Sequence, residues 1–183
     1  MERGEAFTFP PHGESGMTDS TVRPYTGSDA EELWSLKRGF ELGLGDSGGD
    51  DKRARYAAKL TEDYREEWLA WVERCVEEDP DCVQVAVAGR GGAEGPIGYV
   101  FVLPASLSYI WDAAVLNELY LDPPARGTGI ADDLMRAALD CARAQDLPLD
   151  RMVLDVDREN DRARAFYDRW GFDHWGEMVA RPL

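Results

Sequence analysis

Histidine and cysteine are scarce in this chain of 183 residues, and their scarcity narrows the chemistry open to it. Only two histidines are present, His12 and His174, so a histidine-based metal site or catalytic triad is not expected. The three cysteines (75, 82 and 141) are odd in number and widely spaced, with no Cys-x-x-Cys pair. We interpret them as small hydrophobic residues in a reducing compartment rather than as catalytic thiols.

Long apolar runs are also missing. No stretch approaches the length that spans a bilayer, and the first residues lack the hydrophobic region of a signal peptide. The sequence therefore predicts a cytoplasmic protein without a membrane partner.

Lysine is rare, with three lysines (37, 52 and 59) against seventeen arginines. The net charge is −16 and the sequence pI is near 4.4, which argues against a nucleic-acid partner. An acidic, lysine-poor surface indicates adaptation to high salt. The alternative is an acidic groove for cationic acceptors, and the two interpretations are compatible.

The length fits one domain with a substantial core. Residues 1–17 show no periodicity and contain two consecutive prolines, so we expect a flexible extension, with Met17 as an alternative start. Residues 18–183 are expected to form the single domain.

The central stretch, residues 113–131, begins as an apolar run, turns at Pro123 and Pro124, and ends in a glycine-rich loop before an amphipathic helical pattern. Unpaired backbone N–H groups at a helix N-terminus carry the positive end of its dipole and suit a phosphate. Gly127 and Gly129 would let a pyrophosphate approach the backbone, and Arg126 could add a charged contact. The loop lacks the third glycine of the dinucleotide fingerprint and the Lys-Ser/Thr of a Walker loop, which disfavours an ATP site.

Two blocks in this region carry a family resemblance. Residues 126–131 fit Arg-x-x-Gly-x-Ala, and residues 160–172 fit Asn-x-x-Ala-x-x-Phe-Tyr-x-x-x-Gly-Phe. Their order and spacing resemble the GCN5-related N-acetyltransferase (GNAT) superfamily over about residues 20–182. Two departures stand out: Ala131 where many members have glycine, and Thr128 where lysine or arginine is frequent.

The hydrophobic pattern predicts a helix opened by a capping box at Ser28–Glu31, with Leu33, Leu36 and Phe40 on one face. A loop over 43–51 and a long amphipathic segment that breaks near Thr61 follow. The aromatic residues Trp34, Tyr64 and Trp68 are either core or part of an acceptor pocket. Further elements are expected as follows: strands at 21–24, 83–88, 97–103, 113–122, 151–157, 172–175 and 177–182, a loop at 104–112, and helices after 129 and around 163–170, the last ended by Gly171.

These elements give the order β-α-α-β-β-β-α-β-α-β(β). The expected fold class is α/β (α+β mixed): a central mixed, mostly antiparallel sheet with helices on both faces, which is the order of the GNAT fold.

The resemblance implies acetyl transfer from acetyl-CoA to a primary amine of a small molecule or a protein N-terminus, in a ternary complex and without a metal. The implied pyrophosphate loop consists of Arg126, Gly127, Thr128, Gly129, Ile130 and Ala131. The backbone of Leu119, Tyr120 and Leu121 should pair with pantetheine, and an N–H near Leu119 or Tyr120 should polarise the thioester carbonyl. Asn160 should contact the pantetheine arm, or act as a helix N-cap, or do both.

Tyr167 matches the family's general acid for the leaving thiolate, although it and Phe166 could instead be core aromatics. Glu118 is the candidate base, or it could anchor a cationic acceptor. Strand alternation puts it on one face with Leu116 and Tyr120, and a carboxylate on a central strand is costly unless it meets a cavity or a partner. The alternative is a salt bridge between Glu118 and an arginine. The rival function is a non-catalytic acyl-CoA-binding module, and a homodimer is a family-level expectation only.

Overall fold

The computed structural model describes residues 20–46, 50–90, 93–176 and 181, so the expected extension at 1–17 lies outside the described residues. The strands are β1 Ser20–Pro24, β2 Val83–Arg90, β3 Ala93–Val102, β4 Ala114–Leu121 and β5 Met152–Val153. The α-helices are α1 Ala30–Asp46, α2 Asp50–Ala58, α3 Glu62–Glu78, α4 Ile130–Ala144 and α5 Asp161–Arg169. Short 3-10 helices lie at Gly27–Asp29, Ala105–Ile110 and Pro123–Ala125.

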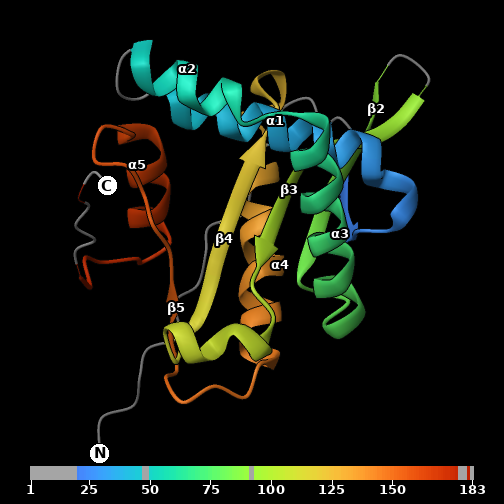
Figure 1. Cartoon of the computed structure of the whole chain (residues 1–183). Coiled ribbons are helices and arrows are strands. Elements are labelled where there is room, and N and C mark those ends of the chain that lie inside the picture. Colours follow the sequence, from blue (N-terminus) through green and yellow to red (C-terminus); the bar gives the residue numbers. More distant parts are fainter. Residues whose placement is uncertain (1–19, 47–49, 91–92, 177–180, 182–183) are drawn as a thin grey trace, which may run out of the picture.

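The five strands form one mixed sheet in the order β1-β2-β3-β4-β5 (Figure 1). Neighbours from β1 to β4 pair antiparallel, and β4 and β5 pair parallel. The parallel pairing involves only Ala114 with Met152 and Val115 with Val153. The two strands therefore separate beyond Val115.

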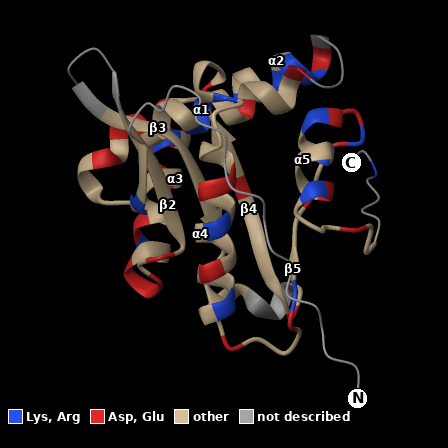
Figure 2. Ribbon diagram, turned by 180° about the vertical axis from the view of Figure 1, so that it is seen from behind, with Lys and Arg blue, Asp and Glu red and all other residues tan. Residues whose placement is uncertain are grey.

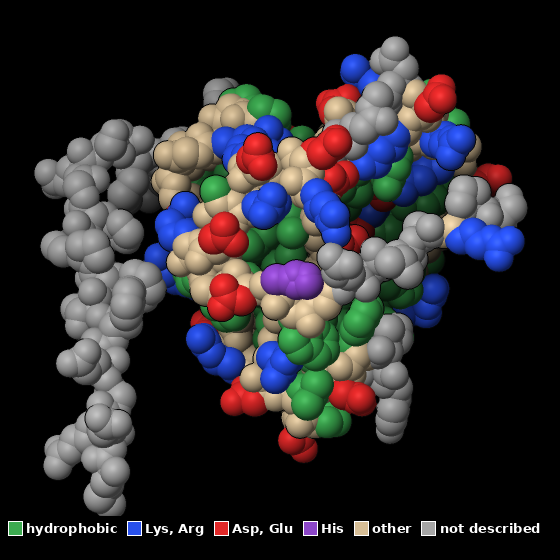
Figure 3. All heavy atoms as spheres, turned by 90° about the vertical axis from the view of Figure 1, so that its left-hand side faces the viewer, with side chains coloured by type: hydrophobic (Ala, Val, Ile, Leu, Met, Phe, Trp, Pro, Cys, Tyr) green, Lys and Arg blue, Asp and Glu red, His purple; other side chains and the backbone are tan. Residues whose placement is uncertain are grey.

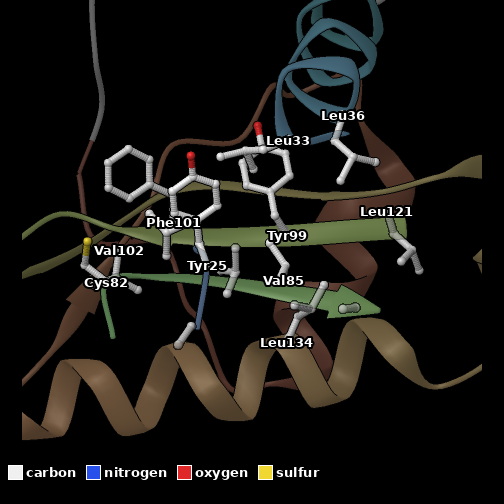
Figure 4. Close-up of a cluster of buried hydrophobic side chains, with 14 of the residues drawn as sticks. Tyr25, Leu33, Leu36, Cys82, Val85, Tyr99, Phe101, Val102, Leu121 and Leu134 are labelled. Carbon is white, nitrogen blue, oxygen red and sulfur yellow. The ribbon is translucent and has the colours of Figure 1, made fainter. Parts of the chain in front are cut away.

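Helices cover both faces of the sheet, as expected. Figure 4 shows α1 on one side of the strands and α4 on the other. Leu33 and Leu36 of α1 are buried against one face, and Leu134 of α4 is buried against the other. The fully buried Tyr99 and Phe101 of β3 lie in the middle of this core. The amphipathic helix predicted after residue 129 is confirmed as α4, in which Ile130, Leu134, Ala138 and Cys141 are all buried.

The start of the first helix differs from the prediction. The capping box is formed by Thr26 and Asp29, ahead of the predicted Ser28–Glu31 pair, and it opens the 3-10 turn from which α1 continues. Asp29 accepts a hydrogen bond from the Thr26 backbone N–H at 2.9 Å and a bidentate pair from Arg23 at 2.7 Å. The arginine on β1 therefore favours the earlier cap, because it holds the Asp29 carboxylate at this turn.

The predicted loop over 43–51 is wrong for the described residues. Helix α1 runs to Asp46 and α2 begins at Asp50. The predicted break near Thr61 is confirmed, since Thr61 caps α3 by accepting a hydrogen bond from the Tyr64 N–H. Three helices, not two, thus connect β1 to β2, and residues 104–112 contain a 3-10 helix where a loop was expected.

The C-terminal region has less strand than predicted. Of the expected strand at 151–157, only Met152 and Val153 pair. No strand forms over 172–176, and the strand expected at 177–182 falls mostly outside the described residues. Gly171 does end the preceding helix as predicted: its φ is +80°, and the Phe172 N–H donates to the Tyr167 carbonyl at 3.1 Å.

Charged residues of both signs lie on the same helices, including α2, α4 and α5 (Figure 2). Among the residues described, no helix has both the length and the apolar character that crossing a bilayer requires.

Candidate active site

A cavity of about 750 Å³ lies beside β4, where β4 and β5 diverge. Its walls come from β4, the loop before α4, residues 155–157, helix α5 and the end of α1. Ten of the twelve candidate residues line it: Glu118, Leu119, Tyr120, Leu121, Arg126, Gly127, Gly129, Ala131, Asn160 and Tyr167. The fold therefore brings together segments as far apart in the chain as Phe40 and Arg169.

The edge of β4 that faces the cavity carries no strand partner over its second half. Leu119, Tyr120 and Leu121 pair with Val100, Tyr99 and Gly98 of β3 on the other edge. Pairing with β5 stops at Val115, and among the described residues no other strand takes its place. An extended ligand with amide groups can add to such an edge.

The glycine-rich loop leads directly into helix α4, as predicted. Gly127 and Gly129 have φ values of +80° and +90°, which side chains rarely adopt, and Gly129 is the N-cap of α4. A Cβ atom at either position would meet nothing within 4 Å. The N-terminus of the 15-residue helix α4 therefore opens onto the cavity, and Gly127 and Gly129 present only backbone there.

Three loop residues have structural roles. Arg126 donates from Nε to the Leu121 carbonyl at 2.9 Å and stacks over the Tyr120 ring. Thr128 donates to the Ala125 carbonyl at 2.6 Å, and Ile130 is buried in the core. Thr128 and Ile130 do not line the cavity. Thr128 stabilises the turn of the loop through its hydrogen bond, and the buried Ile130 anchors the loop to the core.

Arginines add positive charge to this end of the cavity. Arg126, Arg162 and Arg169 all line it, and burial and the nearby Arg126 lower the pKa of Arg162. Arg162 is not among the residues predicted for the site, although it stands two residues after Asn160. Figure 3 shows basic and acidic side chains side by side on this face of the molecule.

Asn160 lies at the N-terminus of α5. Its side chain accepts a hydrogen bond from the Ala163 N–H at 3.1 Å, so the N-cap interpretation is correct. Asn160 also lines the cavity, and its side-chain NH₂ group can still donate.

Tyr167 is half-buried and packs edge-on against Phe166 and Phe172, with ring centroids 5.5 and 5.6 Å away. It also lines the cavity, so it belongs to both the packing of α5 and the site. Burial raises the pKa of its phenol to about 12. In the part of the chain that the structure describes, the phenol makes no hydrogen bond. Tyr167 can therefore hold a proton for a group in the cavity.

Glu118 is buried, with 5% of its surface exposed, and it has close partners. Lys37 Nζ lies 2.5 Å from Oε1, and the Tyr99 hydroxyl donates to Oε2 at 2.5 Å. Asn117 adds a longer contact to Oε1 at 3.3 Å. The salt-bridge interpretation is thus correct, except that the partner is a lysine from α1. A carboxylate has about four acceptor positions, so these three contacts leave one.

Lys37 is itself 3% exposed and lies between two carboxylates, Glu118 and Glu41. Burial lowers the pKa of its ammonium, but the two carboxylates outweigh burial and leave that pKa above its ordinary value. Glu41 lies 2.7 Å from Lys37 and 2.6 Å from Lys59. The sequence held a signal for this pair: Lys37 follows Leu36 on the apolar face of α1, in a chain with three lysines.

The cavity is also lined by Phe40, Gly43, Leu44, Asn117, Asp155 and Asp157. Lys52 of α2 forms a 2.7 Å ion pair with Asp157, which connects α2 to the segment before α5. Trp34, Tyr64 and Trp68 do not line the cavity; they pack with one another against the core. Within the described ranges, no group of three candidate ligand side chains could hold a metal ion.

The chain resembles known proteins in both sequence and structure. It is 32% identical over 168 residues to a mycothiol acetyltransferase of Beutenbergia cavernae, covering 77% of this chain and 54% of that protein. It is 39% identical over 74 residues to a mycothiol acetyltransferase of Salinispora tropica, covering 39% and 24%. The chain thus spans about half the length of the first relative, and less of the second.

Solved structures share the fold. The PaiA N-acetyltransferase of Thermoplasma acidophilum, in complex with coenzyme A, has a TM-score of 0.66 at 20% identity, with 85% of this chain and 90% of that chain covered. The aminoglycoside 6'-N-acetyltransferase AAC(6')-Ig of Acinetobacter haemolyticus has a TM-score of 0.59 at 14% identity, with 89% and 97% covered. Residues 50–172 match the sequence model of the acetyltransferase (GNAT) family, so this chain belongs to that family.

Proposed function

We propose that this chain transfers an acetyl group from acetyl-CoA to an amine, with both substrates bound together. One observation carries the proposal: the open edge of β4, the glycine loop and Tyr167 line the same cavity. These are the parts needed to bind a diphosphate, an amide-containing arm and a leaving thiol in a row.

The donor would bind along β4 and the glycine loop. The unpaired N–H groups at the start of α4 suit its diphosphate, and Arg126 and Arg162 add positive charge. The free edge at Leu119–Leu121 would pair with the pantetheine amides, and Asn160 would donate to the arm. A backbone N–H near Leu119 or Tyr120 would polarise the thioester carbonyl.

The chemistry needs two proton transfers. The acceptor enters as an ammonium and must lose a proton before its nitrogen can attack the thioester carbon. Glu118 would take that proton through a water, using the acceptor position that its three contacts leave free. Tyr167 would protonate the departing sulfur, because burial raises the pKa of its phenol and keeps it a proton donor. As the amide forms, its nitrogen would lose a second proton, which restores the Tyr167 phenol, so that of the two protons lost by the nitrogen one ends on Glu118 and the other, through Tyr167, on the sulfur.

The acceptor is proposed to be a small-molecule amine or a peptide N-terminus. Two relatives are named mycothiol acetyltransferases, and one neighbour in fold is an aminoglycoside acetyltransferase. The cavity lining includes Asp155 and Asp157 as well as apolar Phe40 and Leu44, which suits a cationic amine with an apolar part.

Calorimetric titration with acetyl-CoA, with ATP as the control and in both low and molar salt, tests the donor half. We expect acetyl-CoA to bind and ATP not to bind. An amine panel with thiol release as the readout then tests transfer. Binding without turnover on any amine would support the non-catalytic acyl-CoA module instead, and no binding at either salt would refute acetyl transfer.

A further inference from the structure

A chain of four charged side chains in contact runs from Lys59, which is partly exposed, to the buried Glu118. Lys59 is 39% exposed at its side chain and contacts Glu41, whose side chain is 3% exposed. Glu41 contacts Lys37, and Lys37 contacts Glu118. The contacts alternate in sign, and the four groups, two positive and two negative, sum to zero charge.

Burying such a network is costly, and apolar side chains of similar size often stabilise a fold as well or better. Stabilisation of the fold alone is therefore a weak explanation for this network of four charged side chains. The position of the network is informative, because it ends at the carboxylate that lines the cavity. Within this chain of contacts, Lys37 is the residue of α1 that contacts β4.

We propose that Lys37 is a positioning residue for Glu118, and that Glu41 sets how strongly Lys37 acts. Lys37 orients the carboxylate by holding Oε1, while Tyr99 occupies one acceptor position of Oε2 and leaves the other free. It also places a positive charge 2.5 Å from Oε1. Glu41 offsets this charge, because it shares the same ammonium. This inference rests on the proposed function.

The other groups around Glu118 are neutral or belong to the network. Tyr99 of β3 donates to Oε2, and burial together with Glu118 raises its pKa well above the ordinary value, so it remains a donor. Tyr64 of α3 donates to Glu41 at 3.2 Å, and burial raises its pKa. Asn117 is an amide. The charge that Glu118 experiences is therefore set by Lys37, Glu41 and Lys59.

Two substitutions test this with opposite expected signs. Lys37→Met removes a positive charge next to Glu118, and the network becomes negative overall. Glu41→Gln removes the competing carboxylate, keeps the shape and an acceptor oxygen for Lys37, and makes the network positive overall. The first therefore makes the charge around the proposed base more negative, and the second makes it more positive, so the two variants should change the pH dependence of catalysis in opposite directions.

The readouts are the pH profile of kcat/KM and, in the ligand-free protein, the pH at which the Glu118 carboxyl carbon changes its 13C shift. Lys37→Met should move the acid limb to higher pH by about one unit or more, so that kcat/KM in that limb falls by about tenfold or more. Glu41→Gln should move it to lower pH. Acetyl-CoA affinity should stay unchanged in both variants, because neither residue lines the cavity.

Shifts in the same direction, or wild-type profiles with only a lower melting temperature, would show that the network is structural and would overturn the proposal. If Lys37→Met does not fold, the direction of the shift in Glu41→Gln decides alone. If the wild-type protein binds acetyl-CoA but turns over no amine, the proposed function fails, and the 13C titration still tests Lys37 separately.

Discussion

Substitution of Gly129 tests the diphosphate site most directly. Gly129 has a φ of +90°, caps α4 and lines the cavity, and an added Cβ would meet no atom within 4 Å. Gly129→Ala therefore changes the backbone preference with little clash in the ligand-free protein. Gly129→Glu adds a carboxylate where the diphosphate is expected to lie.

The two effects have separate magnitudes. A side chain in the left-handed region costs about 1 kcal/mol, which lowers the melting temperature of a domain of this size by about 2–4 °C. Two like charges about 4 Å apart near a surface repel by about 4 kcal/mol before salt screening. We therefore expect both variants to fold, and Gly129→Glu to bind acetyl-CoA at least about 100-fold more weakly.

The assay is calorimetric titration with acetyl-CoA beside thermal unfolding. Gly171→Ala is a matched control: Gly171 has a φ of +80°, an added Cβ would also meet nothing within 4 Å, and it does not line the cavity. It should lose similar stability and keep its affinity. Wild-type affinity in folded Gly129→Glu would refute the assignment of the loop to the diphosphate.

Three further predictions follow from the side chains described above. Tyr167→Phe should lower kcat by about ten- to a thousandfold and leave acetyl-CoA affinity nearly unchanged; because burial raises the pKa of Tyr167 to about 12, the wild-type enzyme should not lose its acid between pH 7 and 9. Equal turnover in this variant would exclude Tyr167 as the acid. The hydrogen bonds from Arg23 lower the pKa of Asp29, so its stabilisation is present above the unfolded-state pKa and is lost as pH falls through the folded-state value. Asp29→Asn should therefore be less stable than wild type in urea at pH 7, with a smaller difference near pH 2; a difference that is constant with pH would contradict this. Burial raises the pKa of all three cysteine thiols, that of Cys141 to about 12, so none should react with Ellman's reagent at pH 8 until the protein is denatured. Rapid reaction of the native protein would show that a thiol is accessible.

Local sequence was enough to predict the glycine loop and the ends of α5. Positive φ at Gly127, Gly129 and Gly171 is a property of residues without a side chain, and the N-cap at Asn160 is satisfied within its own turn. Such features depend on a few neighbouring residues, so they can be derived before the fold is known.

The glycines near the end of α1, Gly43 and Gly45, misled the same reasoning, because they fell in the predicted loop over 43–51, whereas Gly39 lay in the predicted helix. A Cβ at Gly39 would lie 2.3 Å from the Tyr120 hydroxyl, and one at Gly45 would lie 3.1 Å from the Arg53 Cα. These glycines allow β4 and α2 to approach the helix closely. A glycine that permits close packing and a glycine that permits a turn look alike in a sequence, and only the tertiary contact separates them.

The partner of Glu118 could not be derived from spacing either. Lys37 and Glu118 are 81 residues apart, and their contact exists only because α1 crosses the face of β4. Strand alternation predicted which face Glu118 occupies, but not which helix would cover that face. The seventeen arginines also made an arginine the more obvious partner.

The short pairing of β5 has a consequence for how the molecule opens. Two residue pairs join β5 to the sheet, and no residue of α5 is fully buried. The ties across the cavity from this segment include Lys52–Asp157 and the contacts of Arg169 and Trp170 with Asp132. Backbone amides of α5 should therefore exchange with deuterium through local opening, while those of β2 and β3 exchange only on global unfolding. A molecule bound between β4 and α5 would slow deuterium exchange in α5 first. Exchange in α5 would therefore measure whether the cavity is occupied.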